Sequence, residues 1–233
     1  MRAMILAAGR GARLRPLTDE TPKPLLRVGG RMLIDWHLTR LAAAGVERVV
    51  INTAWLGEQI EAAVGQGGAW GVEVVYSREP EGALETGGGI ARALPLLGDG
   101  PFWVVNADVW TDYPFERLPR APAGRAHVVL VPNPAHHPGG DFTLDGQGRV
   151  GTPGAPRWTL GGIGAYRPEL WQGCVDGAFA LGPLLQEAAA QGRVTGEVWD
   201  GDWVDVGTPE RLEEADRRAA GRGSGAIAAG TGG

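Results

Sequence analysis

Short apolar runs alternate with segments of helical spacing along the first hundred residues. Ala3–Ala7 is a continuous apolar run, which is typical of a strand buried on both faces of a parallel sheet. Leu33–Ala44 carries apolar residues at helical spacing and ends before Gly45, a natural C-cap. The same patterns predict strands at Arg48–Thr53 and Val72–Tyr76 and a helix at Gly57–Val64. This βαβαβ order predicts an α/β fold, a Rossmann-like, doubly wound, mostly parallel sheet with helices on both faces.

The pattern continues with shorter runs in the second half. Strands are expected at Phe102–Val105, Ala126–Val131, Thr159–Tyr166, Val194–Trp199 and Trp203–Asp205, and helices at Gly87–Leu94, Leu184–Gln191 and Glu210–Ala219. Asp145-Gly146, between Phe142–Leu144 and Arg149–Val150, predicts a hairpin turn. Residues 1–220 are therefore expected to form a single domain. Residues 221–233 contain six glycines and few bulky side chains, so we expect a flexible tail.

The most informative local pattern follows the first predicted strand. The apolar run gives way to small residues, glycines and arginines, and Lys23 then stands between two prolines. Small residues let backbone N–H groups approach an anion closely, and Arg13 and Lys23 would neutralise its charge. This is not a dinucleotide fingerprint, because Leu14 occupies the third glycine position, and no Gly-Lys-Ser/Thr follows as in a P-loop. The segment predicts a strand that runs into a phosphate-cradling loop.

Polar side chains stand at the ends of two other predicted strands. Asp108 follows Phe102–Val105, and Asp205 lies far along the chain at the end of its own strand. Such strand ends border the ligand crevice of an open α/β sheet, although turn capping is the ordinary alternative for aspartate. Asn106 at the same edge is a candidate contact for a ribose or base. Glycines 87–89 can admit a flat group against the backbone, and a flexible loop is the equal alternative.

Composition narrows the function classes. A net charge of −5 gives no basic footprint for nucleic acid, although local arginines can still bind phosphates. Cys174 is the single cysteine, which excludes an internal disulfide and a cysteine-rich metal site. The first apolar run is too short for a signal peptide, and no stretch reaches the roughly 20 apolar residues that span a bilayer. We expect a cytoplasmic protein without nucleic-acid or membrane partners, and its oligomeric state stays open.

Three motifs together resemble those of the sugar-phosphate nucleotidyltransferases, the nucleotide-sugar pyrophosphorylases. The motifs are Leu6-Ala7-Ala8-Gly9-x-Gly11-x-Arg13-Leu14-x-Pro16-Leu17-Thr18 with Pro22-Lys23-Pro24, then Asn106-x-Asp108, then Trp203-x-Asp205-x-Gly207-Thr208-Pro209. The resemblance covers residues 1 to about 219 and implies the family's GT-A-like fold. The sequence departs from the family pattern at Ala107, where glycine is usual, and at Arg157-Trp158, where many relatives carry a sugar-gripping glutamate.

The resemblance implies a reaction that joins a nucleoside triphosphate to a sugar 1-phosphate and releases pyrophosphate. In-line attack of a phosphate oxygen on the α-phosphorus needs no protein nucleophile, so catalysis rests on positioning and charge neutralisation. By resemblance, Asp108 and Asp205 bind Mg²⁺, with Mn²⁺ as a substitute, Arg13 holds the leaving phosphates, and Lys23 neutralises the α-phosphate. The expected nucleotide contacts are Leu6, Ala7, Ala8, Gly9, Gly11, Ala12, Arg13, Lys23, Glu85, Gly88 and Asn106. The expected sugar contacts are Asp141 and Gly161.

Several segments, such as 84–90, 108–113 and 133–142, go beyond the general family pattern. They resemble a branch of the family whose substrates are UTP and N-acetylmuramic acid α-1-phosphate, in peptidoglycan recycling. The lactyl carboxylate of that sugar needs a cation, and Arg157, Arg167 and Arg193 are candidates. Other pairs, GTP with mannose 1-phosphate or dTTP with glucose 1-phosphate, stay open, as does a non-catalytic nucleotide-binding module. The adjacent His136-His137 lies between prolines, which favours a surface loop over a metal site.

Overall fold

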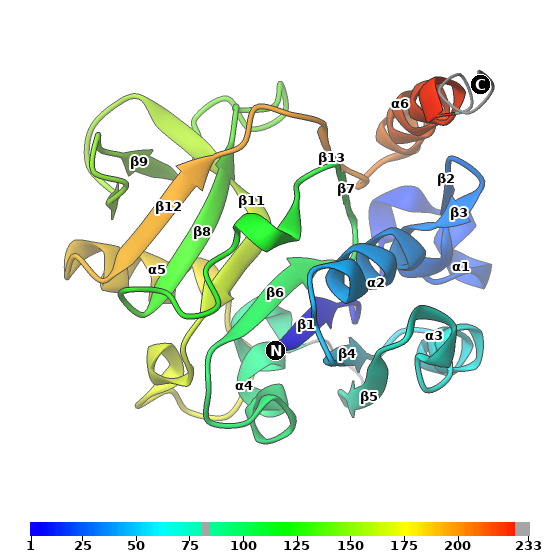
Figure 1. The fold of residues 1–233 in the computed structure, drawn as a ribbon, viewed down its shortest axis with the longest axis horizontal. Coiled ribbons are helices and arrows are strands. Elements are labelled where there is room, and N and C mark those ends of the chain that lie inside the picture. Colours follow the sequence, from blue (N-terminus) through cyan, green and yellow to red (C-terminus); the bar gives the residue numbers. More distant parts are fainter. Residues whose placement is uncertain (81–83, 227–233) are drawn as a thin grey trace, which may run out of the picture.

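The computed structural model describes residues 1–80 and 84–226, and within them the largest sheet has nine strands (Figure 1). The strands of the described chain are β1 (Arg2–Leu6), β2 (Arg27–Val28), β3 (Arg31–Met32), β4 (Arg48–Thr53), β5 (Glu73–Arg78), β6 (Phe102–Asn106), β7 (Val109–Thr111), β8 (Ala126–Val131), β9 (Phe142–Leu144), β10 (Val150–Gly151), β11 (Arg157–Tyr166), β12 (Val194–Val198) and β13 (Trp203–Asp205). The helices are α1 (Leu17–Glu20), α2 (Leu33–Ala43), α3 (Gly57–Val64), α4 (Glu85–Leu97), α5 (Leu181–Ala190) and α6 (Pro209–Ala226). None of these helices has the length and apolarity to cross a membrane.

The parallel half of the sheet has the order β6-β1-β4-β5, with β1 near its centre. Its strands alternate with helices, as the sequence predicts, and the doubly wound α/β class is confirmed. In register, Leu6 at the end of β1 lies between Asn52 of β4 and Asn106 of β6. Three strand ends therefore meet at one edge, where parallel sheets bind ligands.

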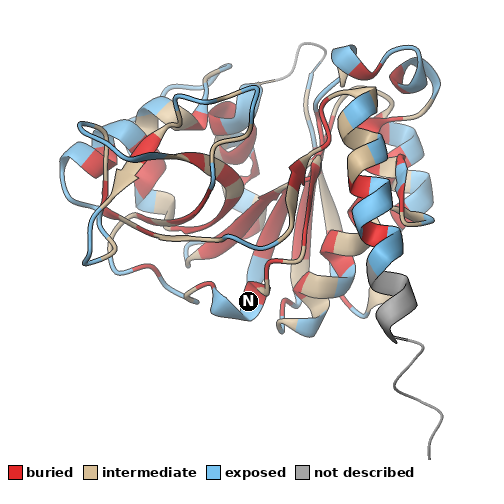
Figure 2. Ribbon diagram, turned by 90° about the horizontal axis from the view of Figure 1, so that it is seen from above, coloured by how far each residue is buried: buried red, intermediate tan, exposed pale blue. Residues whose placement is uncertain are grey.

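Alternating side chains of these strands feed two cores, one on each face of the sheet. Ile5, Ile51 and Val105 join the core under α2 and α3. Met4 and Val50 point to the opposite face, where they pack with residues of α4 and α5. Figure 2 shows the buried strands between helices whose outer surfaces are exposed. Burial on both faces explains why these strands are continuous apolar runs in the sequence.

The other half of the sheet is mixed, and its strands pair mainly antiparallel through β11. This strand pairs antiparallel with β6, β8 and β9, while β12 runs parallel to β8. The expected hairpin is confirmed, since β9 and β10 pair antiparallel around the 145–148 turn. The consecutive strands β12 and β13 do not pair with each other, because β12 joins β8 whereas β13 joins β7.

A third core fixes the C-terminal helix beside the N-terminal loop. Leu14, Trp110 and Val206 pack there with Ala215 and Ala219 of α6. The helix continues to Ala226, so residues 221–226 are helical and the predicted tail boundary at residue 221 lies within α6. Helix propagation from an anchored first turn outweighs the low propensity of the glycines there. Residues 81–83 of the predicted glycine-rich loop and residues 227–233 of the tail lie outside the described residues.

Candidate active site

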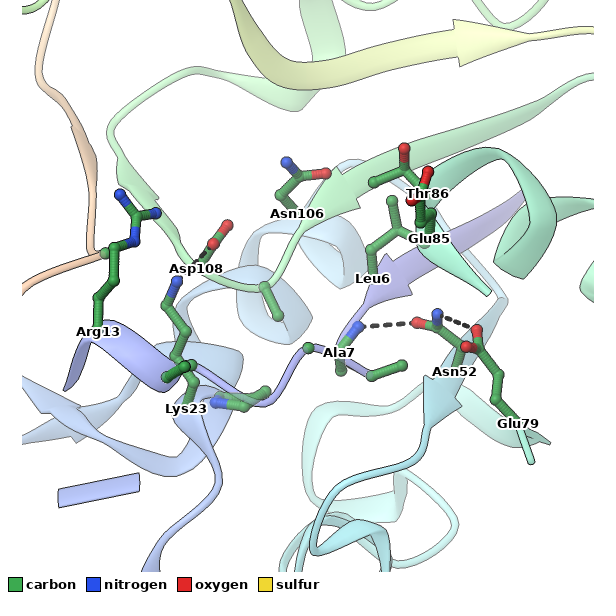
Figure 3. Close-up of a pocket in the computed structure, with 17 residues that line it drawn as sticks. Leu6, Ala7, Arg13, Lys23, Asn52, Glu79, Glu85, Thr86, Asn106 and Asp108 are labelled. Carbon is green, nitrogen blue, oxygen red and sulfur yellow. Dashed lines mark hydrogen bonds and ion pairs between the residues drawn. The ribbon is translucent and has the colours of Figure 1, made fainter. Parts of the chain in front are cut away.

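A cavity opens at the carboxyl end of β1, and we call it the N-terminal loop cavity. It brings together most of the predicted nucleotide contacts, namely Leu6, Ala7, Ala8, Gly9, Gly11, Ala12, Arg13, Lys23, Glu85 and Asn106, with Asp108 beside them. Figure 3 shows Asn52, Glu79 and Glu85 toward one end of this cavity and Arg13, Lys23 and Asp108 toward the other. One end is therefore rich in amide and carboxylate groups, and the other carries two cations.

Lys23 and Asp108 form the central ion pair of this cavity. Lys23 Nζ donates to Asp108 Oδ2 over 2.5 Å, and the side chains are 11 % and 34 % exposed. Lys23 is also the only lysine in the sequence, which otherwise uses arginine wherever a Lys or Arg stands. A lysine offers a compact point charge with three donors, unlike the planar fork of arginine. The pair places one such charge against a carboxylate at the end of β6.

The loop after β1 is braced by hydrogen bonds from its own neighbours. Gly11 has a φ of +68°, and a Cβ there would approach Thr18 to 3.0 Å. Thr18 Oγ1 donates to the Gly11 carbonyl over 2.8 Å, and Trp55 Nε1 donates to the Thr18 carbonyl over 2.9 Å. Glycine suits the left-handed conformation that this turn requires. The loop is thus held open toward the cavity by contacts on its outer side.

The three arginines of this loop differ in their partners. The Arg10 guanidinium lies 3.8 Å from the centroid of the Trp55 ring, and Arg15 Nε is 3.0 Å from Asp19 Oδ1. Arg13 forms no ion pair with any residue in the described part of the chain, and it lines the N-terminal loop cavity and two further cavities. An unpaired guanidinium at a junction of cavities is available for an anionic ligand.

Two residues that line the N-terminal loop cavity, Asn52 and Glu79, were not predicted from the sequence. The Ala7 N–H donates to Asn52 Oδ1 over 2.7 Å, and Asn52 Nδ2 donates to Glu79 Oε1 over 2.7 Å. Glu79 Oε2 in turn accepts the Leu84 N–H over 2.9 Å. This chain of bonds ties the loop after β1 to the segment that leads into α4. The available signal was the position of Asn52, a polar side chain near the carboxyl end of a predicted parallel strand.

The two predicted metal ligands come together although 97 positions separate Asp108 from Asp205. The strand β13 pairs antiparallel with β7, so that Asp205 lies opposite Val109, and the Val206 N–H donates to the Asp108 carbonyl over 2.8 Å. Both carboxylates line what we call the central cavity, together with Asn106 and Gly161. Asp205 Oδ2 accepts a hydrogen bond from Arg211 Nη1 over 2.8 Å. Within the described residues, no group of three or more His, Cys, Asp and Glu side chains could hold a metal ion by itself.

His37 supports the backbone next to Asp108. It is fully enclosed on α2, and burial, together with the nearby charge of Arg40, lowers its pKa to about 4. A hydrogen bond to the Val109 backbone and the charge of Asp108 raise its pKa in the opposite direction, but burial dominates. A neutral imidazole therefore sits beneath β7 without adding charge to the cavity.

Two predicted contacts have other roles in the structure. The Gly88 N–H donates to the Phe179 carbonyl over 3.0 Å, and a Cβ at Gly88 would approach the Gly177 carbonyl oxygen to 2.1 Å, so this glycine serves the packing of α4. Asp141 uses both carboxylate oxygens within the protein, one with His137 Nε2 at 2.9 Å and the other accepting the Leu160 N–H at 2.8 Å. Neither residue lines the three cavities described here.

The adjacent histidines lie in a partly exposed loop, and both also face the candidate active site. His136 and His137 both line the central cavity, and each side chain is 43 % exposed. His136 also lines a third cavity beside the first turns of α6, which we call the α6 cavity. The three arginines proposed for the lactyl carboxylate line none of these cavities; Arg157 bonds the Asp141 carbonyl and Arg167 the Pro122 carbonyl.

The sequence and the fold both match known proteins. The family model described as nucleotidyl transferase matches residues 2–149. The chain is 53 % identical to the N-acetylmuramate alpha-1-phosphate uridylyltransferase of Neisseria meningitidis serogroup B, over 94 % of this chain and 98 % of the relative. It is 38 % identical to the protein of the same name from Caulobacter vibrioides, over 94 % and 96 % of the two chains.

A solved structure shares the fold at low sequence identity. It is a putative glucose-1-phosphate thymidylyltransferase from Bacillus anthracis, with a TM-score of 0.81 and 20 % identity over 94 % of this chain and 96 % of that one. The agreement extends over both halves of the sheet, so it includes the elements beyond the matched family model. With the Lys23–Asp108 pair and Asp205 gathered at the carboxyl edge of β1, the chain belongs to the nucleotidyl transferase family.

Proposed function

We propose that this protein transfers a uridylyl group from UTP to N-acetylmuramic acid α-1-phosphate, giving UDP-N-acetylmuramic acid and pyrophosphate. The observation that carries the proposal is the 53 % identity to a uridylyltransferase of that specificity over nearly the full length of both chains. The geometry supports the reaction class, because Lys23, Asp108 and Asp205 meet beside a loop built of small residues.

The shape of the N-terminal loop cavity suggests how UTP lies in it. Asn52, Glu79 and Glu85 offer amide and carboxylate groups toward one end, which suits the hydrogen-bonding edge of a base and the ribose hydroxyls. Arg13 and Lys23 toward the other end suit the triphosphate. In this orientation, the backbone of residues 7–12 follows the nucleotide from base to phosphates.

The chain's own residues then account for positioning and charge. Lys23 neutralises the α-phosphate and the incoming sugar phosphate, while Arg13 holds the leaving β- and γ-phosphates. The sugar phosphate enters through the central cavity, which Gly161 and Gly162 of β11 line. A sugar-phosphate oxygen attacks the α-phosphorus, and the bond to the pyrophosphate oxygen breaks on the far side. Fixed cations that meet charge as it develops lower the barrier without a covalent intermediate.

The carboxylates present fit a Mg²⁺ ion. Asp108 and Asp205 are oxygen donors on adjacent backbones, and each forms an ion pair, Asp108 with Lys23 and Asp205 with Arg211. Mg²⁺ usually takes one or two carboxylates and completes its octahedron with phosphates and water, which agrees with two protein ligands here. When bound, the ion would neutralise phosphate charge as a Lewis acid, and Mn²⁺ would also suit these ligands.

We place the reaction in the cytoplasm, where UTP is available, and its product is an activated muramic acid of the kind used to build peptidoglycan. The proposal is tested by initial rates of pyrophosphate release from UTP, GTP and dTTP, each paired with the 1-phosphates of N-acetylmuramic acid, N-acetylglucosamine, mannose and glucose. We expect the highest kcat/KM with UTP and N-acetylmuramic acid 1-phosphate. A higher value with another pair would refute the substrates but keep the reaction class. No turnover with any pair would refute the enzyme proposal.

A further inference from the structure

The α6 cavity adjoins the central cavity and is lined mainly by arginines and apolar side chains. The two cavities share Arg13, His136, Trp203 and Asp205, so they are neighbouring parts of one hollow. Beyond the shared residues, Arg211 and Arg218 contribute guanidinium groups, and Val131, Pro134 and Ala135 form an apolar wall. If the sugar lies over Gly161, its substituents lie next to the α6 cavity. The lining suits a substituent with one apolar and one anionic part.

Arg211 is the most enclosed arginine of this cavity, since Arg13 and Arg218 are exposed. Its side chain is 14 % exposed, and its Nη1 lies 2.8 Å from Asp205 Oδ2 and 2.8 Å from His136 Nε2. Arg218, by comparison, is 42 % exposed and is held by Glu214 and Asp202. The first turn of α6 therefore aims Arg211 back at the site.

Two guanidinium groups converge where the chain leaves β13. A Cβ built on Gly207 would meet Arg211 Nη2 at 2.3 Å and Arg13 Nη2 at 3.0 Å. Glycine at this position is what lets both side chains lie against the backbone. Like charges brought together in this way repel each other unless an anion neutralises them. Asp205 pairs with Nη1 of Arg211, and the five N–H donors of a guanidinium leave Arg211 able to hold a second anion.

We propose that Arg211, beside His136, binds the carboxylate of the lactyl ether on the sugar substrate, while the methyl group packs on Val131, Pro134 and Ala135. This proposal rests on the proposed function, because it requires a sugar with an acidic side chain. A guanidinium matches a carboxylate with paired donors, and a partly enclosed site strengthens the interaction. The lactyl group, with its methyl and its carboxylate, has the two kinds of surface that the cavity offers.

His137 and Asp141 shape the other side of this subsite. Asp141 Oδ1 holds His137 Nε2 at 2.9 Å, and its second oxygen is fixed by the Leu160 N–H of β11. Asp141 thus positions His137 in the central cavity. In this arrangement His136 and His137 form the polar wall between the sugar and its lactyl group.

The test removes the charge from each side of the contact in turn. The sugar substrate is compared with an analogue in which the lactyl carboxylate is a carboxamide, and each is assayed with wild type and Arg211→Gln. We expect Arg211→Gln to lower kcat/KM for the carboxylate substrate about 10- to 100-fold more than for the carboxamide, the range of a charge-assisted hydrogen bond. The exposed Arg217 on the same helix gives the matched control, and Arg217→Gln should treat both substrates as wild type does.

The possible results separate a failure of the Arg211 contact from a failure of the proposed function. If wild type prefers the carboxylate substrate but Arg211→Gln loses the same factor on both substrates, Arg211 acts only through Asp205 or the phosphates, and the inference fails while the function stands. If wild type does not distinguish the carboxylate from the carboxamide, the muramic acid assignment fails, and the inference with it. Should Arg211→Gln not fold, the half-exposed His136→Gln provides the second variant, with a smaller loss expected on the carboxylate substrate alone.

Discussion

The proposed chemistry depends most on one residue, the single lysine. Lys23 lies in a short helical turn after Pro22, and its ammonium group reaches Asp108 with little solvent around it. A charge in such a place acts on a phosphate with less screening than it would at the surface. Lys23 is therefore fixed at the place where the proposed reaction needs negative charge to be neutralised.

Replacing Lys23 by methionine keeps the length of the side chain and removes its charge. We expect Lys23→Met to lower kcat about 100- to 1000-fold, the scale seen when one fixed charge-stabilising group is removed. Lys23→Arg keeps the charge but not the compact geometry, so it should retain more activity than Lys23→Met. Pyrophosphate release measures both, with circular dichroism to check folding. Near wild-type turnover of a folded Lys23→Met would show that this lysine has no catalytic role.

Residues inside dense sequence motifs were predictable, whereas residues that work through distant neighbours were not. Arg13, Lys23 and Asp108 stand in recognisable patterns, and the structure brings them to one cavity. Asn52 braces Ala7 from 45 positions away, and Arg211 reaches His136 across 75 positions. Their roles depend on strand register and on the docking of α6, which no local pattern encodes. Asp141 illustrates the converse, because its place in a motif did not reveal that both its oxygens are used within the protein.

At the scale of elements, α2 carries a buried histidine that makes stability depend on pH. Burial holds the pKa of His37 at about 4, below its usual value of 6.5, so the folded state binds fewer protons than the unfolded state between these two pH values. The free energy of unfolding should therefore fall as the pH drops through this window, by up to about 3 kcal/mol. Urea titrations at pH 7, 6, 5 and 4 measure the change.

A variant identifies the group responsible for this slope. His37→Leu should weaken the dependence between pH 6.5 and 4. Part of the slope should persist in His37→Leu, because burial also lowers the pKa of His127. An unchanged slope in His37→Leu would assign the acid sensitivity to other groups.

Elements with strong local patterns were predicted closely, and those fixed by long-range pairing were not. The predicted Arg48–Thr53 and Gly57–Val64 match β4 and α3 in their bounds. The short strand β7 was missed, since it exists through its pairing with β13 across the chain. α5 begins at Leu181, earlier than predicted, because Gly182 and Pro183 fall in its first turn, where proline is tolerated.

At the scale of the whole molecule, the two halves of the sheet contribute different parts of the candidate active site. The parallel half supplies the N-terminal loop cavity, and the mixed half supplies Gly161 and the histidines of the central cavity. The link between β13 and α6 closes the site with Asp205 and Arg211. The cavities at this edge place Arg13, Lys23 and Arg211 among carboxylates. These local cations can bind an anionic group although the net charge of the protein is −5.

The most direct test of this account is to identify the product formed from UTP and N-acetylmuramic acid 1-phosphate by wild type, Asp108→Asn and Asp99→Asn. Asp99 is an exposed carboxylate just before β6, at the opposite end of that strand from Asp108. Mass spectrometry should show UDP-N-acetylmuramic acid with wild type and Asp99→Asn, and a rate lower by about 100-fold or more with Asp108→Asn. Formation of the product at equal rates by all three proteins would contradict the placement of the reaction at this edge of the sheet, and its absence with wild type would contradict the reaction itself.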